Sequence, residues 1–416
     1  MAVWKGSNIM KEYSYILFIA LILLSTKILG LVTKKMKLPQ VVGALLAGVI
    51  LGPAVLNLVQ ETEFISELSE IGVIVLMFTA GLTTDVKELK KTGKASFIIA
   101  LLGVIVPLFG GLGLAAAMGV GKGDNLACSP FLQHLFIGVV LTATSVSITV
   151  ETLKELGKLS TRAGNAILGA AIIDDILGII ALTMVISMAD SSVSIGMVLL
   201  KILGFFVFTF VAAVGYHYAF KKWTDNNPVK LRRYVVISFA FCLVLAYCAE
   251  EFFGVADITG AFFAGLAISG TKKADYVTKR FDTLSYLLLS PIFFASIGLK
   301  VVLPKMNLEI VLFTVIICLV AVLTKVIGCG LGAKICKYSN KEALQIGVGM
   351  ISRGEVALIV ANKGEAVGLM SDKFFAPIVI MVVLTTIITP VLLKVVFKDK
   401  NDAGKAEEKE PAAAAK

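Results

Sequence analysis

Two adjacent carboxylates, Asp174 and Asp175, lie in the middle of a long apolar stretch, residues 161 to 190. A stretch of this length can cross a membrane as a helix, because about 20 residues span roughly 30 Å of hydrocarbon. The two acids would then lie near the middle of the bilayer, where an ionised side chain is costly and is usually functional. The pair is therefore the first candidate for binding a proton or a cation.

The two carboxylates cannot face the same partner, because consecutive residues of an α-helix point about 100° apart. We expect one of them to pair with a buried cation and the other to face a water-filled cavity, where it takes a proton or a metal ion. Two ionised acids this close would also repel each other and titrate as a coupled pair. The alternative is a structural role, in which both acids hold neighbouring helices together.

Lys325 is the expected partner, because it lies inside the apolar residues 309 to 333, far from either end. An unpaired lysine at that depth would tend to lose its proton, so a carboxylate is expected beside it. Lys27 and Lys201 lie closer to the ends of their apolar stretches. We interpret these two as lysines that reach the membrane surface with their ammonium groups.

Arg353 and Glu355 lie on either side of Gly354 in the apolar residues 343 to 362. Opposite charges beside a glycine predict an interrupted helix, because they can compensate freed backbone groups and the dipoles of half-helices.

The apolar residues 130 to 151 contain a hydroxyl-rich segment, Thr142–Thr149. This stretch is the counterpart of residues 343 to 362 in an internal repeat of the chain, which is described below. We expect a second broken helix here, which crosses the first near the aspartates. Its carbonyls and the hydroxyls of Thr144 and Ser145 could coordinate a small cation. The same hydroxyls also suit ordinary hydrogen bonds between membrane helices.

The composition favours a helical membrane protein with several spans, since 57% of the 416 residues are hydrophobic and only 16% are charged. The six cysteines form no C-x-x-C pair, so neither a disulfide framework nor a zinc site is indicated. The net charge of +10 does not indicate nucleic-acid binding, because basic loops on one side of a membrane account for it.

Thirteen apolar stretches predict an all-α polytopic membrane protein with 13 transmembrane helices. They cover roughly residues 13 to 32, 39 to 59, 66 to 84, 95 to 120, 130 to 151, 163 to 189, 193 to 220, 234 to 249, 257 to 270, 283 to 303, 309 to 333, 343 to 362 and 374 to 397.

The loops after the odd-numbered stretches carry 22 lysines and arginines, and the loops after the even-numbered stretches carry five. Basic loops stay in the cytoplasm, so we expect the N-terminus outside and the C-terminus inside.

The chain also contains a weak internal repeat. Gly43-Ala-Leu-Leu-Ala-Gly48 matches Gly260-Ala-Phe-Phe-Ala-Gly265, and Gly81-Leu matches Gly298-Leu, each at a separation of 217 residues. The two copies begin on opposite sides of the membrane, which predicts the inverted-topology repeats of secondary transporters. A chance similarity between small-residue helix faces is the alternative.

Together these residues resemble a known family along essentially the whole chain. The resemblance is to bacterial sodium/proton antiporters of the cation:proton antiporter 2 class, of the NapA type. It rests on Ile-Ile-Asp174-Asp175, the Thr-Ala-Thr-Ser segment that ends at Ser145, Lys325, and Ser352-Arg-Gly-Glu355.

The resemblance implies a core ion-transport domain, a dimerisation domain and a helix that links them. The dimerisation domain would comprise residues 1–92 and 223–304, the core domain residues 93–190 and 305–397, and the linker helix residues 191–222. Residues 398–416 are polar and alanine-rich, and we expect a disordered cytoplasmic tail there.

In that family the position of Asp175 is the main carrier of cation and proton, and the position of Asp174 pairs with the lysine at Lys325. Electroneutral relatives commonly have asparagine at the first position. This chain has aspartate, so the resemblance implies electrogenic exchange, with two protons per sodium ion.

The expected function is therefore secondary active antiport of sodium, or lithium, against protons, which compete for Asp175 while the core domain moves. The resemblance also implies a homodimer in the bacterial cytoplasmic membrane, with Na⁺ or Li⁺ and H⁺ as cargo and no resident cofactor. Potassium/proton exchange, a channel and a non-transporting sensor remain alternatives. Intramembrane aspartyl proteases also use two aspartates, but the chain has no Tyr-Asp dipeptide, so we do not expect an enzyme.

Overall fold

A computed structural model describes residues 13–36, 38–121, 128–189, 194–226, 231–301 and 308–398. Within these ranges the regular secondary structure is entirely helical, which confirms the predicted all-α class. All but the first residue of the predicted tail, residues 398–416, lie outside the described part of the chain.

The helices follow one another along the chain with short connections. They are α2 (Ser14–Lys35), α3 (Gln40–Leu51), α4 (Glu63–Thr83), α5 (Val86–Ala117), α6 (Pro130–Thr142), α7 (Val146–Glu155), α8 (Arg162–Ala189), α9 (Ile195–Asn226), α10 (Leu231–Phe253), α11 (Asp257–Ser269), α12 (Ala274–Leu284), the π-helical η1 (Ser285–Leu289), α13 (Ser290–Leu299), α14 (Leu308–Ile335), α15 (Asn340–Gly349), α16 (Glu355–Ala366), the 3₁₀-helical η2 (Asp372–Phe374) and α17 (Phe375–Val396).

Among the described residues, 10 helical segments are long and apolar enough to cross a membrane, and α3 and α11 are shorter apolar helices. Each of the predicted apolar stretches coincides with helix. The number of membrane crossings itself stays a prediction. The helix α3 is shorter than its apolar stretch and ends at Leu51, because Pro53 lacks a backbone N–H and disfavours helical geometry at Gly52.

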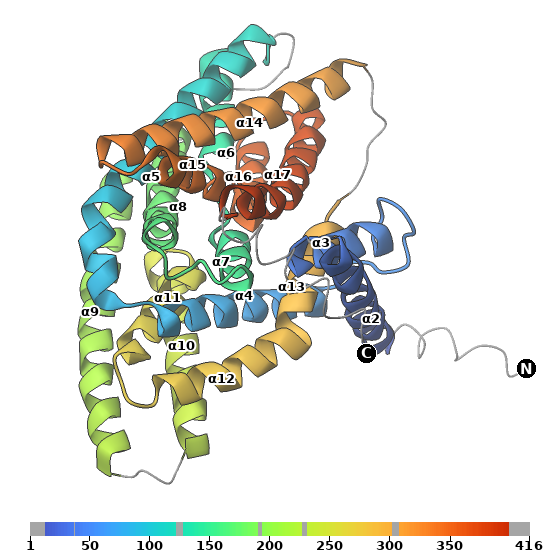
Figure 1. Ribbon diagram of the computed structural model, residues 1–416. Helices are drawn as coiled ribbons and strands as arrows, with labels where there is room; N and C mark the ends of the chain where they lie inside the picture. The colour runs from blue at the N-terminus through green and yellow to red at the C-terminus, as the bar shows by residue number, and fades with distance from the viewer. Residues whose placement is uncertain are drawn as a thin grey trace, which may run out of the picture.

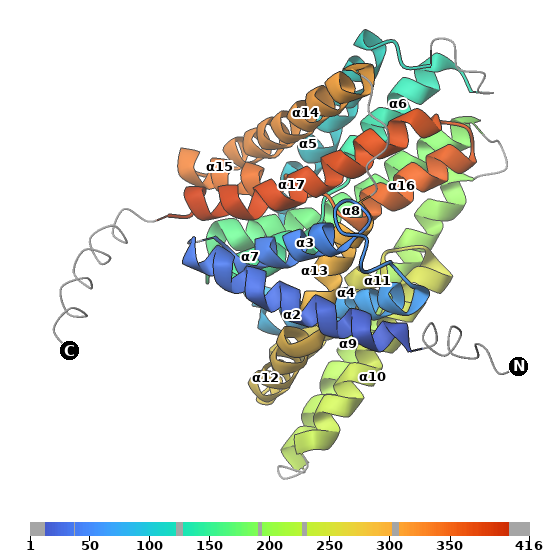
Figure 2. The same ribbon diagram turned by 90° about the vertical axis from the view of Figure 1, so that its right-hand side faces the viewer.

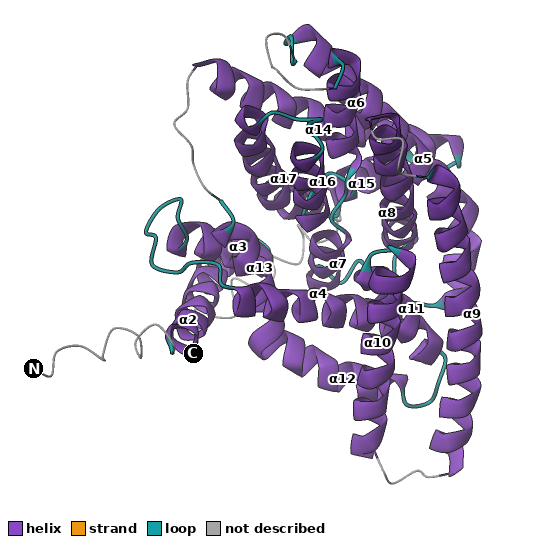
Figure 3. Cartoon of the chain, turned by 180° about the vertical axis from the view of Figure 1, so that it is seen from behind, coloured by secondary structure: helices purple, strands orange, loops and turns teal. Residues whose placement is uncertain are grey.

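The helices form two groups that are visible in Figure 1. One group contains α5, α6, α8 and α14 to α17, and the other contains α2, α3, α4 and α10 to α13. The long helix α9 runs along one side of the molecule past both groups, as the view from behind also shows (Figure 3). Between the groups, α7 packs against both α3 and α17 (Figure 2).

Close contacts between glycines reflect the internal repeat. A Cβ on Gly298 of α13 would lie 2.7 Å from the carbonyl carbon of Gly48 of α3. In the same way, a Cβ on Gly265 of α11 would lie 3.0 Å from the carbonyl carbon of Gly81 of α4. The repeat relates Gly48 to Gly265 and Gly81 to Gly298, so each contact is the counterpart of the other. Backbones that approach this closely leave no room for a side chain, which explains why both copies keep glycine.

Candidate functional site

Two broken helices, α6–α7 and α15–α16, cross each other. The α6–α7 helix is interrupted at residues 143–145 and the α15–α16 helix at residues 350–354. The backbone N–H of Ser145 donates to the carbonyl of Ser352 at 2.7 Å, and the Ser352 hydroxyl donates to the carbonyl of Ser145 at 2.9 Å. This reciprocal pair joins the two interruptions at the predicted crossing.

Further hydroxyls satisfy backbone carbonyls that the interruptions release. The Thr149 hydroxyl donates to the carbonyl of Gly349 at 2.8 Å and lies 2.8 Å from the Ser352 hydroxyl. The Thr386 hydroxyl of α17 donates to the carbonyl of Arg353. Such partners are needed because unpaired backbone groups are costly in a membrane interior.

The crossing also requires a glycine on one side. A Cβ on Gly354 would lie 2.7 Å from the Ser145 hydroxyl oxygen and 3.0 Å from the Ser145 Cβ. Any larger residue would push the two interrupted segments apart. Gly354 is therefore needed for close approach rather than for an unusual backbone conformation.

Asp174 and Lys325 form a buried ion pair beside this crossing. The Lys325 ammonium lies 2.8 Å from Oδ1 and 3.0 Å from Oδ2 of Asp174. The side chains are 0% and 1% exposed, and they come from the middle of α14 and of α8. The helix α14 thus places its buried lysine against the first of the two aspartates.

Asp175 has a different environment from its neighbour. Consecutive helical side chains diverge by about 100°, so Asp175 is turned away from Lys325. The residue is 6% exposed, against 1% for Asp174, and both carboxylate oxygens of Asp175 are buried. The Thr144 hydroxyl lies beside the carboxylate of Asp174, whereas the Ser145 hydroxyl lies 3.3 Å from that of Ser147.

Arg353 is fully buried and uses its guanidinium to join three helices. It donates to the carbonyls of Ile351 at 2.6 Å, Leu141 at 2.8 Å and Ala321 at 3.0 Å. Leu141 lies at the C-terminal end of α6, where a cation stabilises the helix dipole. Ala321 lies one turn before Lys325 on α14, so the guanidinium also ties the lysine-bearing helix to the crossing. The side chain of Glu355 lies outside the described side chains, and its backbone begins α16.

Two residues that the sequence did not indicate lie beside the ion pair. A Cβ on Gly103 of α5 would lie 3.7 Å from Oδ1 of Asp174, 3.8 Å from the Lys325 ammonium and 2.6 Å from the sulfur of Cys329. Gly103 and Cys329 therefore close one side of the pair. Neither residue carries a signal in the sequence, since each is a small residue in an apolar stretch.

The assembled site combines an acid paired with a lysine, a second buried acid next to it, and backbone carbonyls and hydroxyls at two helix interruptions. Oxygen atoms of these kinds are the ligands that hard monovalent cations use in place of water. A carboxylate in the same place can also hold a proton. The arrangement therefore suits a small cation or a proton as alternative occupants.

Comparisons with known proteins agree with this chemistry. The chain matches the family of transmembrane sodium/hydrogen exchangers over residues 19–399. The Na⁺/H⁺-K⁺ antiporter GerN of Bacillus cereus is 40% identical over 397 residues, which cover 95% of this chain and 99% of that protein. A Na⁺/H⁺ antiporter of Enterococcus hirae is 38% identical over 391 residues, which cover 91% of this chain and 97% of that protein.

The fold also resembles a solved structure. The sodium proton antiporter MjNhaP1 from Methanocaldococcus jannaschii, determined at pH 8, superposes with a TM-score of 0.68 over 92% of this chain and 97% of that chain. The sequences are 18% identical, so this likeness concerns the fold alone.

Proposed function

The chain belongs to the sodium/hydrogen exchanger family, and from that premise we propose that sodium, or lithium, and protons compete for Asp175. The observation that carries this proposal is the buried pair between Asp174 and Lys325. The pair engages Asp174 with a fixed cation, so we assign the transported ions to Asp175, which follows it on α8 and points to another side of the helix.

Competition at one carboxylate couples the two ions without a separate coupling device. A proton that reaches Asp175 displaces the cation, and a cation that binds displaces the proton. The hydroxyls of Thr144 and Ser145 and the carbonyls freed at the crossing supply oxygen ligands that replace the water shell of a sodium ion.

We also propose that the exchange moves net charge. The site contains two carboxylates and a lysine, so more than one group can carry a proton for each cation. An asparagine in place of Asp174 would remove one of these groups and leave Lys325 without its counter-ion. Two protons per sodium ion is the stoichiometry that we propose.

Alternating access would come from movement of one helix group against the other. The proposed core comprises residues 93–190 and 305–397, and the proposed dimerisation domain comprises residues 1–92 and 223–304, with 191–222 as the linker. One continuous apolar cluster packs α5, α6, α8, α14, α16 and α17 together, which supports a core that moves as a unit. We propose a homodimer in the bacterial cytoplasmic membrane, with the N-terminus outside.

Proton flux into vesicles that contain the purified chain tests the function. Sodium or lithium added outside should drive proton movement in the wild type, and Asp175→Asn should abolish it. Glu67→Gln, an exposed acid of α4, is the control and should transport normally. Preserved exchange in Asp175→Asn would contradict the proposal.

The same vesicles separate the alternatives. The name of the Bacillus cereus relative includes potassium, so potassium is compared with sodium and lithium at each pH. Larger flux with potassium would favour potassium/proton exchange. Passive cation conduction without proton movement would indicate a channel instead.

A further inference from the structure

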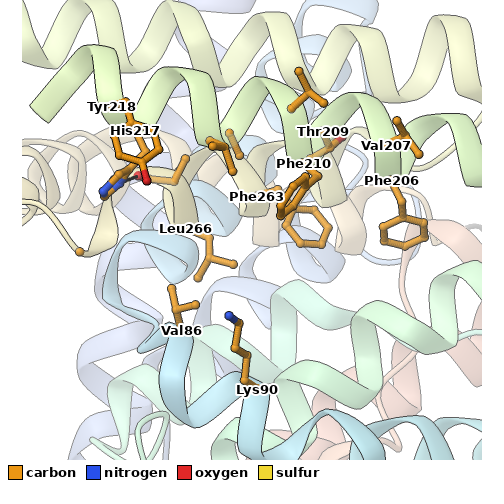
Figure 4. A pocket seen from close by; sticks show the side chains of 15 residues that line it. Val86, Lys90, Phe206, Val207, Thr209, Phe210, His217, Tyr218, Phe263 and Leu266 are labelled. Carbon is orange, nitrogen blue, oxygen red and sulfur yellow. Dashed lines mark hydrogen bonds between the residues drawn. The ribbon is translucent and has the colours of Figure 1, made fainter.

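A pocket of about 840 Å³ lies away from the ion site, between α9, α11 and the start of α5 (Figure 4). Its wall is mostly apolar and includes Phe206, Phe210, Val211, Phe263 and Leu266. Phe210 and Val211 are 70% and 64% exposed, so this side of α9 faces the surrounding membrane. The pocket is thus an apolar hollow that opens toward lipid.

Polar groups are confined to a few places in this pocket. The Lys90 side chain extends from α5 toward Leu266 and Phe263, so that its ammonium points into the pocket (Figure 4). His217 and Tyr218, in the last third of α9, also line the pocket. The Nδ1 atom of His217 lies 2.7 Å from the carbonyl of Ala267, so Nδ1 carries the proton and Nε2 is left to bind another group.

We propose that this pocket binds an anionic phospholipid. One acyl chain lies against the phenylalanines of α9 and α11, and the phosphate lies at the ammonium of Lys90. Charge selects the head group, because the ammonium of Lys90 points into the pocket and attracts an anion.

A lipid fits this hollow better than a second copy of the chain. The pocket is concave, and three elements of one chain form it around an inward-pointing ammonium. A lipid has a flexible acyl chain that packs against the apolar wall and an anionic head group that pairs with the ammonium. The rigid, apolar outer face of a membrane helix would pack against the wall but would leave the ammonium without an anion.

Native mass spectrometry of the purified chain tests the proposal with dioleoyl phosphatidylglycerol and dioleoyl phosphatidylcholine at equal concentration. Wild type should retain the anionic lipid more than the zwitterionic one. Lys90→Gln should lower retention of phosphatidylglycerol about fivefold, since one lysine near an anionic lipid contributes about 1 kcal/mol. Lys87→Gln, on the same turn of α5 but outside the pocket, should retain it like wild type.

A second pair of variants separates binding in the pocket from attraction to the charged surface. Ala213→Trp fills the pocket and should lower phosphatidylglycerol retention with Lys90 intact. Leu203→Trp places the same bulk on a part of α9 that is 62% exposed and outside the pocket, and it should have no effect.

Three results of these lipid measurements would overturn the proposal. They are equal retention of the two lipids by wild type, equal effects of the two lysine variants, and normal retention in Ala213→Trp. A disulfide between two copies of a Val211→Cys variant in a membrane would also overturn it, because it would show a second chain seated on this face.

Discussion

The ammonium of Lys325 lies 2.8 Å from the carboxylate of Asp174, although 151 residues separate them in the chain. Both side chains are removed from water, so each charge depends on the other. This pair ties α14 to α8 at the level of the helix crossing. In the proposed mechanism the next residue, Asp175, is the acid that binds the transported ion.

Removal of Lys325 should destabilise the fold. Lys325→Met leaves Asp174 buried without its counter-charge, and breaking a buried pair from one side costs about 3 to 5 kcal/mol. The double variant Asp174→Asn with Lys325→Met should recover part of this loss, since neither charge remains. Unfolding midpoints in detergent are measured for the two single variants and for the double variant. A loss in the double variant equal to the sum of the losses in the single variants would contradict the energetic coupling of the pair.

Lys325→Gln should affect charge movement more than cation binding, because Gln can still hydrogen-bond to Asp174 but carries no charge. Proton flux is measured in vesicles at several imposed membrane voltages, along with the apparent KM for sodium. We expect a weaker voltage response with a similar KM. An unchanged voltage response would count against electrogenic exchange through this pair.

The apparent KM for sodium should rise as the pH falls. A proton and a sodium ion that compete for one carboxylate make each other's apparent affinity weaker, and a tenfold higher proton concentration requires up to about tenfold more sodium. The measurement is sodium-driven proton flux at a series of pH values. A pH-independent KM with a falling maximal rate would instead indicate protonation at a separate site.

Gly103→Ala should disturb the ion pair through Cys329. The added methyl would lie 2.6 Å from the cysteine sulfur, so the sulfur must move, and overpacking of this kind typically costs about 1 to 3 kcal/mol. Cys329→Ala in the same chain should relieve the effect. Gly113→Ala on the same helix meets nothing within 4 Å and serves as the control. Equal unfolding midpoints for the two glycine variants would show that the site tolerates the methyl.

Glu342 at the exposed start of α15 should contribute pH-dependent stability. Partial burial acts to raise its pKa, but hydrogen bonds from the backbone and hydroxyl of Ser339 and the charge of Arg162 outweigh this and lower it. The stabilisation is therefore present above the unfolded-state pKa of about 4.3 and is lost as the pH falls through the lower folded-state pKa.

Glu342→Gln is the test of this contribution. It should cost about 0.5 to 1 kcal/mol at neutral pH, because it weakens the capping box with Ser339, and almost nothing in acid. Unfolding midpoints at pH 7 and near pH 3 make the comparison. The same loss at both values would show that the carboxylate charge is not involved.

Local features of the sequence determined much of this architecture. Long apolar stretches specify membrane helices, because their length and composition leave few alternatives. The glycine and charges at Gly354, and the hydroxyl-rich segment near Ser145, indicated the two interruptions for equally local reasons. The repeated glycines at a constant separation predict the internal repeat, which the close contacts between them reflect.

Only the tertiary structure decided which residues meet. From the residues alone, Lys325 could pair with either aspartate, and the choice of Asp174 came from a family resemblance. The contact depends on how α8 and α14 are rotated about their axes, which the helical period does not determine. The same holds for the carbonyls that Arg353 reaches and for Gly103 and Cys329 beside the ion pair. These contacts arise from close packing between distant segments, and a single sequence carries no local signal for them.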